Sequence, residues 1–348
     1  MLTLPLDPRF PEPDVIERAA RCLREGGLVA FPTETVYGLG ANALDADAAA
    51  RIFVAKQRPA NDPLIVHLAS AADLPRVAIH VPPVAYQLAE RFWPGPLTLV
   101  LPRGPAVPAV VTSGGTSVAV RVPSHPVARA LIAAAGVPVA APSANLFSRP
   151  SPTAAAHVIE DLDGRLDLVL DGGATTIGVE STVLDLTTAP PRVLRPGAVT
   201  ADMLRSLIPD LATGTRPGTP GTAASPGLLE THYAPRAVLT LYAGPDEPRR
   251  LRMLSEVRNA VGSGARIGAV VTDDEVAAFS AAGAVVASLG AAGDLDTAAV
   301  RLYAALRSLD TAGVERIVAT AIPADEHLGA ALADRLGRAA SGRIVTVH

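Results

Sequence analysis

Two basic residues, Lys56 and Arg58, lie two positions apart in the segment from Ala55 to His67. Side chains two residues apart in an extended chain point to the same side. An ammonium and a forked guanidinium on one face can bind the oxygens of a polyphosphate. The alternative interpretation of Lys56 and Arg58 is a solvated basic turn. His67, at the end of the same segment, could likewise be an ordinary histidine at a strand end without a functional role.

Lys56 is unusual in this chain because it is the only lysine among 30 basic residues, the other 29 being arginine. Chance could leave one lysine at any position. The functional interpretation is that this position requires a compact ammonium that a planar guanidinium cannot replace. We therefore predict that Lys56 and Arg58 are the catalytic cations.

A third candidate cation, Arg121, lies in the segment SVAVRVP that begins at Ser117. In a strand, alternation would place the three valines on one face and Ser117, Ala119 and Arg121 on the other. The fork of Arg121 suits a carboxylate or a phosphate. The alternative is an arginine without a ligand on a solvent-facing edge strand.

Three further segments combine small, polar and basic residues. The glycines and threonines of PTETVYGLGANA (32–43) suit close approach of a ligand to the backbone, although an ordinary glycine-rich turn into a helix has the same composition. Ser143 and Asn145 are two apart in PVAAPSANLFSRPSPT, which could equally be a capped loop. Ser181 begins one expected strand and Arg195 ends another before a Pro-Gly turn. None of these residues is an obvious general base.

Composition excludes several classes of protein. The net charge of −4 provides no general attraction to nucleic acid, so an anionic ligand requires a local basic cluster. The single cysteine, Cys22, rules out an internal disulfide and a cysteine-based zinc site, and no protein metal site is expected. The P-loop, H-E-x-x-H and G-x-S-x-G motifs are missing. Without a signal sequence or a long apolar run, we expect a cytoplasmic protein without a membrane partner.

Hydrophobic periodicity predicts two α/β domains, as 348 residues exceed the size of a typical single core. Residues 1–205 indicate a mixed α/β domain, with helices over 14–25, 46–57, 83–92, 126–135 and 153–161. Residues 206–236 are rich in Pro and Gly and are predicted to be an interdomain linker and a candidate cover for the active site. Strands and helices alternate over 237–348, which predicts a smaller Rossmann-like, doubly wound parallel sheet. Its first strand is not followed by G-x-G-x-x-G, so dinucleotide binding has little support.

Taken together, the motifs resemble the YrdC-like family, specifically its two-domain threonylcarbamoyl-AMP synthases. The resemblance is carried in order by PTETVYGLG, Lys56-x-Arg58, PLIVH, WPGPLTLVL, SVAVRVP, APSAN, SPT, GVESTV and RPG, followed by HYAP (232–235). It implies a twisted open α/β sheet with a concave positive pocket. It also implies a reaction of L-threonine, bicarbonate and ATP to threonylcarbamoyl-AMP and pyrophosphate. The product would supply the complex that transfers the threonylcarbamoyl group to tRNA next to the anticodon.

The resemblance also implies roles for individual residues. Contacts to threonine are expected from Thr35, His67, Arg121, Ala141 and Ser181. Contacts to ATP are expected from Lys56, Arg58, Asp62, Ser117, Ser143, Asn145, Ser151, Arg195 and Tyr233. Magnesium is expected on the ATP phosphates, because it rarely uses an all-protein cage.

The sequence departs from the family pattern at two places. Asp62 stands where the family usually has Asn, and an acid there would repel a triphosphate unless it meets Mg²⁺ or turns away. Phe147-Ser148 replaces a usual Ser-Gly. Two other functions fit the sequence less well. A hydrogenase maturation factor that transfers carbamoyl groups would carry cysteine-rich fingers. An RNA-binding module would need more phosphate-neutralising cations, so RNA binding is expected to be weak at most.

Overall fold

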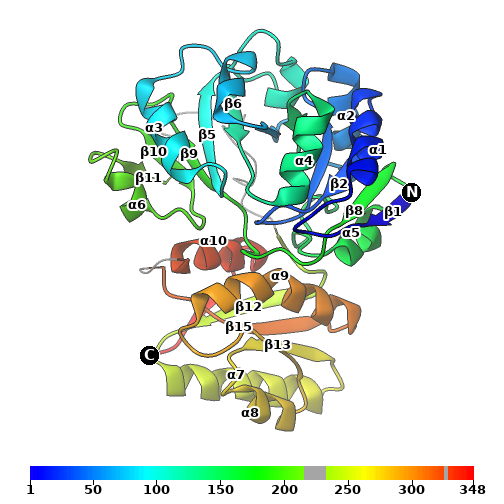
Figure 1. Cartoon of the computed structure of the whole chain (residues 1–348). Helices are drawn as coiled ribbons and strands as arrows, with labels where there is room; N and C mark the ends of the chain where they lie inside the picture. Colours follow the sequence, from blue (N-terminus) through cyan, green and yellow to red (C-terminus); the bar gives the residue numbers. More distant parts are fainter. Residues whose placement is uncertain (215–232, 325–327) are drawn as a thin grey trace. The chain divides into compact units, whose positions relative to one another are not determined.

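A computed structural model describes residues 1–214, 233–324 and 328–348. The chain forms two compact units (Figure 1). Of the described residues, the first unit holds 1–147, 152–176 and 180–214, and the second holds 148–151, 177–179 and 233–348 apart from the gap. The expected linker at 206–236 falls mostly outside the described residues, but its beginning belongs to the first unit, where Ala212–Thr213 forms a strand against Arg192–Arg195.

A large mixed sheet organises the first unit. Its strand order, among the described residues, is β1-β8-β2-β3-β7-β4-β6-β5-β9-β10-β11. The strands are β1 Leu2–Pro5, β2 Val29–Phe31, β3 Gly38–Asn42, β4 Ile65–His67, β5 Leu97–Pro102, β6 Ser117–Arg121, β7 Val139–Ala140, β8 Leu168–Asp171, β9 Thr182–Asp185, β10 Arg192–Arg195 and β11 Ala212–Thr213. Parallel and antiparallel pairs are mixed, which confirms the expected irregular α/β sheet.

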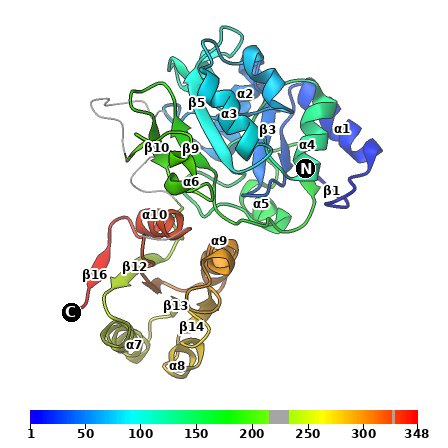
Figure 2. The ribbon, with the colours of Figure 1, turned by 60° about the vertical axis from the view of Figure 1, so that its left-hand side comes forward.

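Helices and small side chains complete the first unit. The helices are α1 Pro13–Arg24, α2 Ala46–Lys56, α3 Pro83–Phe92, α4 Pro126–Ala135, α5 Ala155–Leu162 and α6 Ala201–Arg205, with 3₁₀ helices at Ala71–Arg76 and Ala109–Thr112. Helices α1 and α4 lie side by side (Figures 1 and 2) and share one core with β2 and β8. A second core of mostly Ala, Val and Leu joins β2 to β10 with α2, α3 and α5. Such short side chains allow the close packing that a chain with 3% aromatic residues requires.

Part of the glycine-rich segment forms a strand. The sequence pattern predicted no strand within 32–43, and a turn into a helix was left open there, but Gly38–Asn42 is β3, which pairs antiparallel with β2 and β7. A Cβ on Gly40 would lie 2.7 Å from Phe31 Cε1 and 2.9 Å from Val139 Cγ1. This glycine therefore permits close packing of neighbouring strands, which sequence composition alone could not distinguish from a turn.

The second unit is the predicted doubly wound domain. Its five strands have the order β14-β13-β15-β12-β16, and all of their pairings are parallel. Helices α7 and α8 cover one face of the sheet and α9 and α10 the other (Figures 1 and 2). The bounds are β12 Val238–Ala243, α7 Asp246–Gly262, β13 Ile267–Val271, α8 Val276–Ala281, β14 Val285–Ser288, α9 Leu295–Thr311, β15 Arg316–Thr320, α10 Gly329–Ala339 and β16 Ile344–Thr346.

Candidate active site

Arg121, the last residue of β6, is held by three groups from two segments of the first unit. Its Nη2 lies 2.6 Å from Glu34 Oε1, and its Nη1 donates to Thr35 Oγ1 at 3.0 Å. Its Nε donates to the Gly95 carbonyl at 3.1 Å. The residue is only 3% exposed. The sequence prediction that Arg121 faces a built site rather than solvent is therefore consistent with its surroundings.

Glu34 is the residue that sequence reasoning missed. Burial alone would raise the pKa of its carboxyl, but the charge and hydrogen bonds of Arg121 outweigh this and hold the pKa below its usual value. The Ser124 backbone N–H also donates to Glu34 Oε2, at 3.1 Å. Glu34 is therefore a buried carboxylate anion paired with Arg121. An acid between two threonines in PTETVYGLG was a visible signal, but only the fold reveals its partner.

His67 lies beside Arg121 because β4 and β6 are parallel neighbours and these two residues are paired in register. Burial, and then the positive charge of Arg121, lower the pKa of His67 to about 3. The imidazole is therefore neutral near pH 7. Its Nδ1 is buried without a hydrogen-bond partner among the described residues. A neutral ring with one unsatisfied nitrogen can exchange a hydrogen bond with a ligand.

A second group of polar side chains surrounds Ser181, which directly precedes β9. Ser181 Oγ and Thr98 Oγ1 are 2.7 Å apart and share a hydrogen bond. Arg195, at the end of β10, donates from Nε and Nη2 to the Ser181 carbonyl at 3.1 and 3.0 Å. The sheet register explains this grouping. The antiparallel β9–β10 pair brings Arg195 opposite Val183, and β5 carries Thr98 beside β9.

Lys56 ends α2 and binds backbone carbonyls. Its Nζ donates to the carbonyl oxygens of Ser143 and Asn145, at 2.5 Å each, and the residue is 1% exposed. The Gly38–Ser143 bridge then connects this loop to the start of β3. Lys56 therefore fixes the loop that presents Ser143 and Asn145, a task that suits a compact ammonium. Whether Lys56 also contacts ATP stays a prediction.

Arg58 and Asp62 form a buried pair. Arg58 Nη2 lies 2.8 Å from Asp62 Oδ2, and its Nε and Nη2 donate to the Asp62 and Pro63 carbonyls at 2.9 and 2.8 Å. Asp62 is fully buried. Because Arg58 neutralises it, Asp62 need not repel a triphosphate. The contacts of both residues with ATP stay predictions.

The remaining predicted site residues are more widely placed. Ala141 follows β7, where its N–H donates to the Ile65 carbonyl at 2.9 Å, and Ser117 begins β6, at the other end from Arg121. Ser151 and Tyr233 belong to the second unit. There Tyr233 is buried, with its ring 5.6 Å from the Tyr303 ring and 5.4 Å from the Arg335 guanidinium carbon. None of these positions tests the predicted ligand contacts. Ser148, at the second departure from the family, has a φ of 68°.

The described contacts join the first unit's candidates in separate small groups. Lys56 binds the Ser143 loop, which bridges to the start of β3, Arg121 binds Thr35 and Gly95, and Ser181 binds Thr98 and Arg195. Within the described ranges, no cluster of His, Cys, Asp and Glu has the geometry to hold a metal ion. None of the helices in these ranges is both long and apolar enough to cross a membrane.

Comparisons with known proteins agree with the motifs. A family model described as telomere recombination matches residues 21–197, and one described as threonylcarbamoyl-AMP synthase, C-terminal domain, matches 199–341. A threonylcarbamoyl-AMP synthase of Pyrococcus abyssi is 44% identical, covering 95% of this chain and 96% of the relative. One from Bacillus subtilis is 45% identical, covering 95% and 94%. The crystal structure of P. abyssi Sua5 complexed with L-threonine matches with a TM-score of 0.93 and 42% identity, covering all of both chains.

Similarity over nearly the whole chain identifies an enzyme of the nucleotidyltransferase type. The chain belongs to the threonylcarbamoyl-AMP synthase family, in the form that carries both domains. The resemblance drawn from the sequence motifs is thereby confirmed.

Proposed function

We propose that this chain makes threonylcarbamoyl-AMP from L-threonine, bicarbonate and ATP and releases pyrophosphate. The observation that carries the proposal is the buried Arg121–Glu34 pair, with Thr35 and the neutral His67 beside it. Its combination of one guanidinium and one carboxylate is complementary to the two charges of a free amino acid. The threonine complex of the P. abyssi relative, whose chain this one matches throughout, supports the same ligand.

In this proposal, Arg121 binds the threonine carboxylate with the part of its fork that Glu34 leaves available. Glu34 would balance the guanidinium charge and face the amino group. Thr35, His67 and Ser181 would donate to or accept from the remaining polar atoms of threonine, with the Ala141 region forming part of the wall. A desolvated site strengthens each of these interactions relative to water.

The chemistry requires an oxygen nucleophile. Carboxylation of the threonine amine by bicarbonate forms an N–C bond, breaks the C–OH bond of bicarbonate and gives a carbamate and water. A carbamate oxygen then attacks the α-phosphorus of ATP in line. The α–β phosphoanhydride bond breaks and pyrophosphate leaves. Charge spreads over the phosphoryl and leaving oxygens, so Lys56, Arg58 and Arg195 would act through positioning and electrostatics.

Magnesium would enter with ATP, held chiefly by phosphate oxygens and water. The donor set of the first unit fits this arrangement, because Asp62 is buried against Arg58 instead of being presented as an open carboxylate. ATP contacts from Ser117, Ser143, Asn145, Ser151 and Tyr233 are part of the same proposal. We further propose a cytoplasmic location, where the product would be passed to a tRNA threonylcarbamoyl-transfer complex, with any direct RNA contact weak and secondary.

The direct experiment incubates the full chain with threonine, ATP, Mg²⁺ and ¹⁴C-bicarbonate. We expect pyrophosphate and a labelled adenylate in equal amounts, both dependent on threonine. Pyrophosphate release without threonine, or no labelled adenylate under conditions that trap this unstable product, would contradict the proposal. Serine in place of threonine provides the matched control for recognition of the substrate methyl group.

A further inference from the structure

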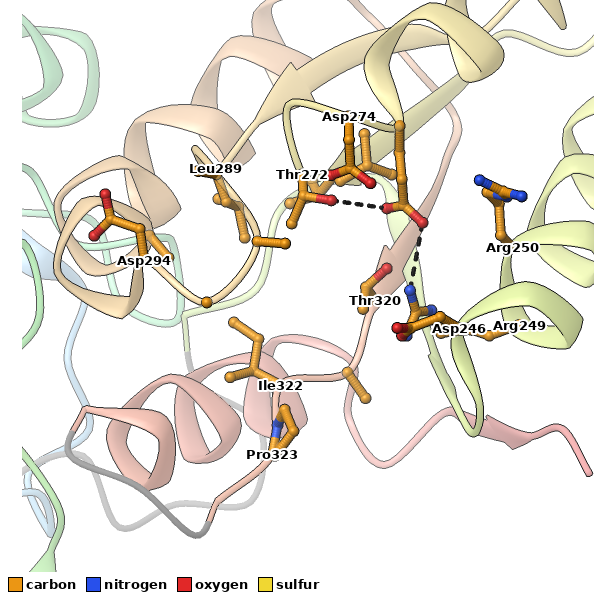
Figure 3. A pocket seen from close by; sticks show the side chains of 18 of the residues that line it. Asp246, Arg249, Arg250, Thr272, Asp274, Leu289, Asp294, Thr320, Ile322 and Pro323 are labelled. Atoms are coloured by element: carbon orange, nitrogen blue, oxygen red, sulfur yellow. Dashed lines mark hydrogen bonds and ion pairs between the residues drawn. The ribbon is translucent and has the colours of Figure 1, made fainter.

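A cavity of about 950 Å³ opens in the second unit, outside the carboxyl ends of β12, β13, β14 and β15 (Figure 3). In open α/β sheets, ligands bind at this edge where the connections leave toward opposite faces. The connection after β12 forms α7 on one face, and the connection after β15 leads to α10 on the other. The volume lies at the upper end of the range for small-molecule pockets, roughly 300–1,000 Å³. Both position and size are those of a ligand crevice.

One side of the cavity carries a partly buried polar network. Arg249 Nη2 lies 3.3 Å from Glu275 Oε1, and Thr272 Oγ1 lies 3.4 Å from Glu275 Oε2 (Figure 3). Arg249 Nε is buried and has no hydrogen-bond partner among the described residues. A buried donor without an acceptor is unfavourable. An acceptor atom of a bound molecule could satisfy it.

The charge of the lining argues against phosphate. Five carboxylates and two guanidiniums line the cavity: Asp246, Glu247, Asp274, Glu275 and Asp294 against Arg249 and Arg250. The N-termini of both neighbouring helices are also already matched with acids. Asp294 caps α9 by accepting from the Thr297 N–H at 3.0 Å, and the first turn of α7 carries Asp246 and Glu247. The features that usually bind phosphate at this edge of a sheet are therefore neutralised.

The rest of the lining suits an apolar body with hydroxyl groups. Aliphatic residues, including Leu289, Ile322 and Pro323, form one part of the wall, and Thr272 and Thr320 add hydroxyls to the same lining (Figure 3). Asp274 is exposed and has no hydrogen-bond or ion-pair partner among the described residues, so its oxygens can accept from a ligand. Acids near this edge bind ribose hydroxyls in related architectures.

We propose that this cavity is a second ligand site of the chain, for a nucleoside without phosphate or a compound of that size bearing hydroxyl donors. The base would lie against the aliphatic wall, and the sugar hydroxyls would donate to the acids at the carboxyl end of β13. The site is distinct from the proposed ATP and threonine site, because none of its lining residues is among those proposed to contact ATP or threonine.

The test uses the full chain labelled with ¹³C at isoleucine δ1 methyls, with adenosine as the probe. The Ile322 signal is assigned with Ile322→Val. We expect adenosine to shift this signal in a saturable way, and Ala291→Trp, at an exposed lining position, to abolish the shift. Ala281→Trp, exposed in the same unit but outside the lining, should leave the shift intact. Asp274→Asn should weaken adenosine about tenfold or more, whereas Asp296→Asn outside the lining should not.

Three results would overturn the inference. The first is no shift of Ile322 with adenosine in a chain that gives a folded spectrum. The second is a shift with ATP at least as strong as that with adenosine and also abolished by Ala291→Trp, which would show that phosphate is accepted. The third is a shift with spermidine but not adenosine, which would identify a site for cations.

Discussion

Replacing Arg121 by alanine tests the proposed carboxylate contact. The change removes a guanidinium that is 3% exposed and bonded to Glu34, Thr35 and Gly95. Truncating one partner of a desolvated charge pair costs roughly 2–5 kcal/mol, which is a factor of about 30 to 4,000 in binding. We expect the KM for threonine to rise within that range while the KM for ATP changes little.

The same substitution leaves the Glu34 carboxylate buried without its cation, which should lower the free energy of unfolding by about 3–5 kcal/mol. The double variant Arg121→Ala with Glu34→Gln removes that orphan charge. We expect the double variant to regain much of the lost stability in urea unfolding, but not the threonine affinity.

Steady-state pyrophosphate release at varied threonine and ATP, together with urea unfolding, separates the two effects. A double variant with wild-type threonine KM would refute the reasoning, because Arg121 would then have acted only by neutralising Glu34. An equal rise in the KM for both substrates would refute the assignment of Arg121 to threonine.

Three further changes test other parts of the account. Lys56→Arg keeps the charge, but a planar guanidinium cannot take the place of the ammonium between the Ser143 and Asn145 carbonyls, so turnover and stability should both fall. The control Arg258→Lys, at an exposed position, should be neutral in the same assays. Intact turnover of Lys56→Arg would make the single lysine a coincidence. His67 has a pKa of about 3 in the folded state against 6.5 in the unfolded state, so between these pH values the unfolded state binds more protons and stability falls as the pH drops. His67→Gln should flatten this part of the plot of unfolding free energy against pH. An unchanged slope would count against a buried neutral imidazole. Gly40→Ala should lower the free energy of unfolding by about 1–3 kcal/mol, because the added Cβ would clash with Phe31 and Val139. Gly262→Ala, where the Cβ would meet open space, should be tolerated in the same thermal unfolding experiment. Equal melting temperatures of the two variants would disprove the close packing at Gly40.

Local pattern predicted most of the elements, because periodicity depends on neighbouring residues alone. The alternation in SVAVRVP correctly gave a strand, which in the structure ends at Arg121, and the βα alternation of residues 237–348 correctly gave a parallel sheet. The Gly38–Asn42 strand was missed because the reason for a glycine at position 40 is its packing against Phe31 and Val139. These two residues belong to other strands, so local sequence does not reveal the contact. The strand Leu2–Pro5 was missed because its partner, Leu168–Asp171, lies far along the chain.

The candidate site was predictable as a set of residue types, but not as a set of partners. Motifs identified Lys56, Arg58 and Arg121, whereas their pairing with carbonyls, Asp62 and Glu34 depends on tertiary packing. The apparent conflict at Asp62 shows the difference. In sequence it is an acid near a proposed triphosphate, and in the fold it is the buried partner of Arg58. Charge alone does not reveal whether a side chain faces a ligand or another side chain.

The most direct test of the central claim is a crystal structure of this chain with L-threonine and a non-hydrolysable ATP analogue. The account predicts the threonine carboxylate within about 3 Å of the Arg121 guanidinium, a normal hydrogen-bond distance, with the α-phosphate of the analogue facing the threonine amine. Threonine bound elsewhere, or bound beside Arg121 without any contact between carboxylate and guanidinium, would contradict it.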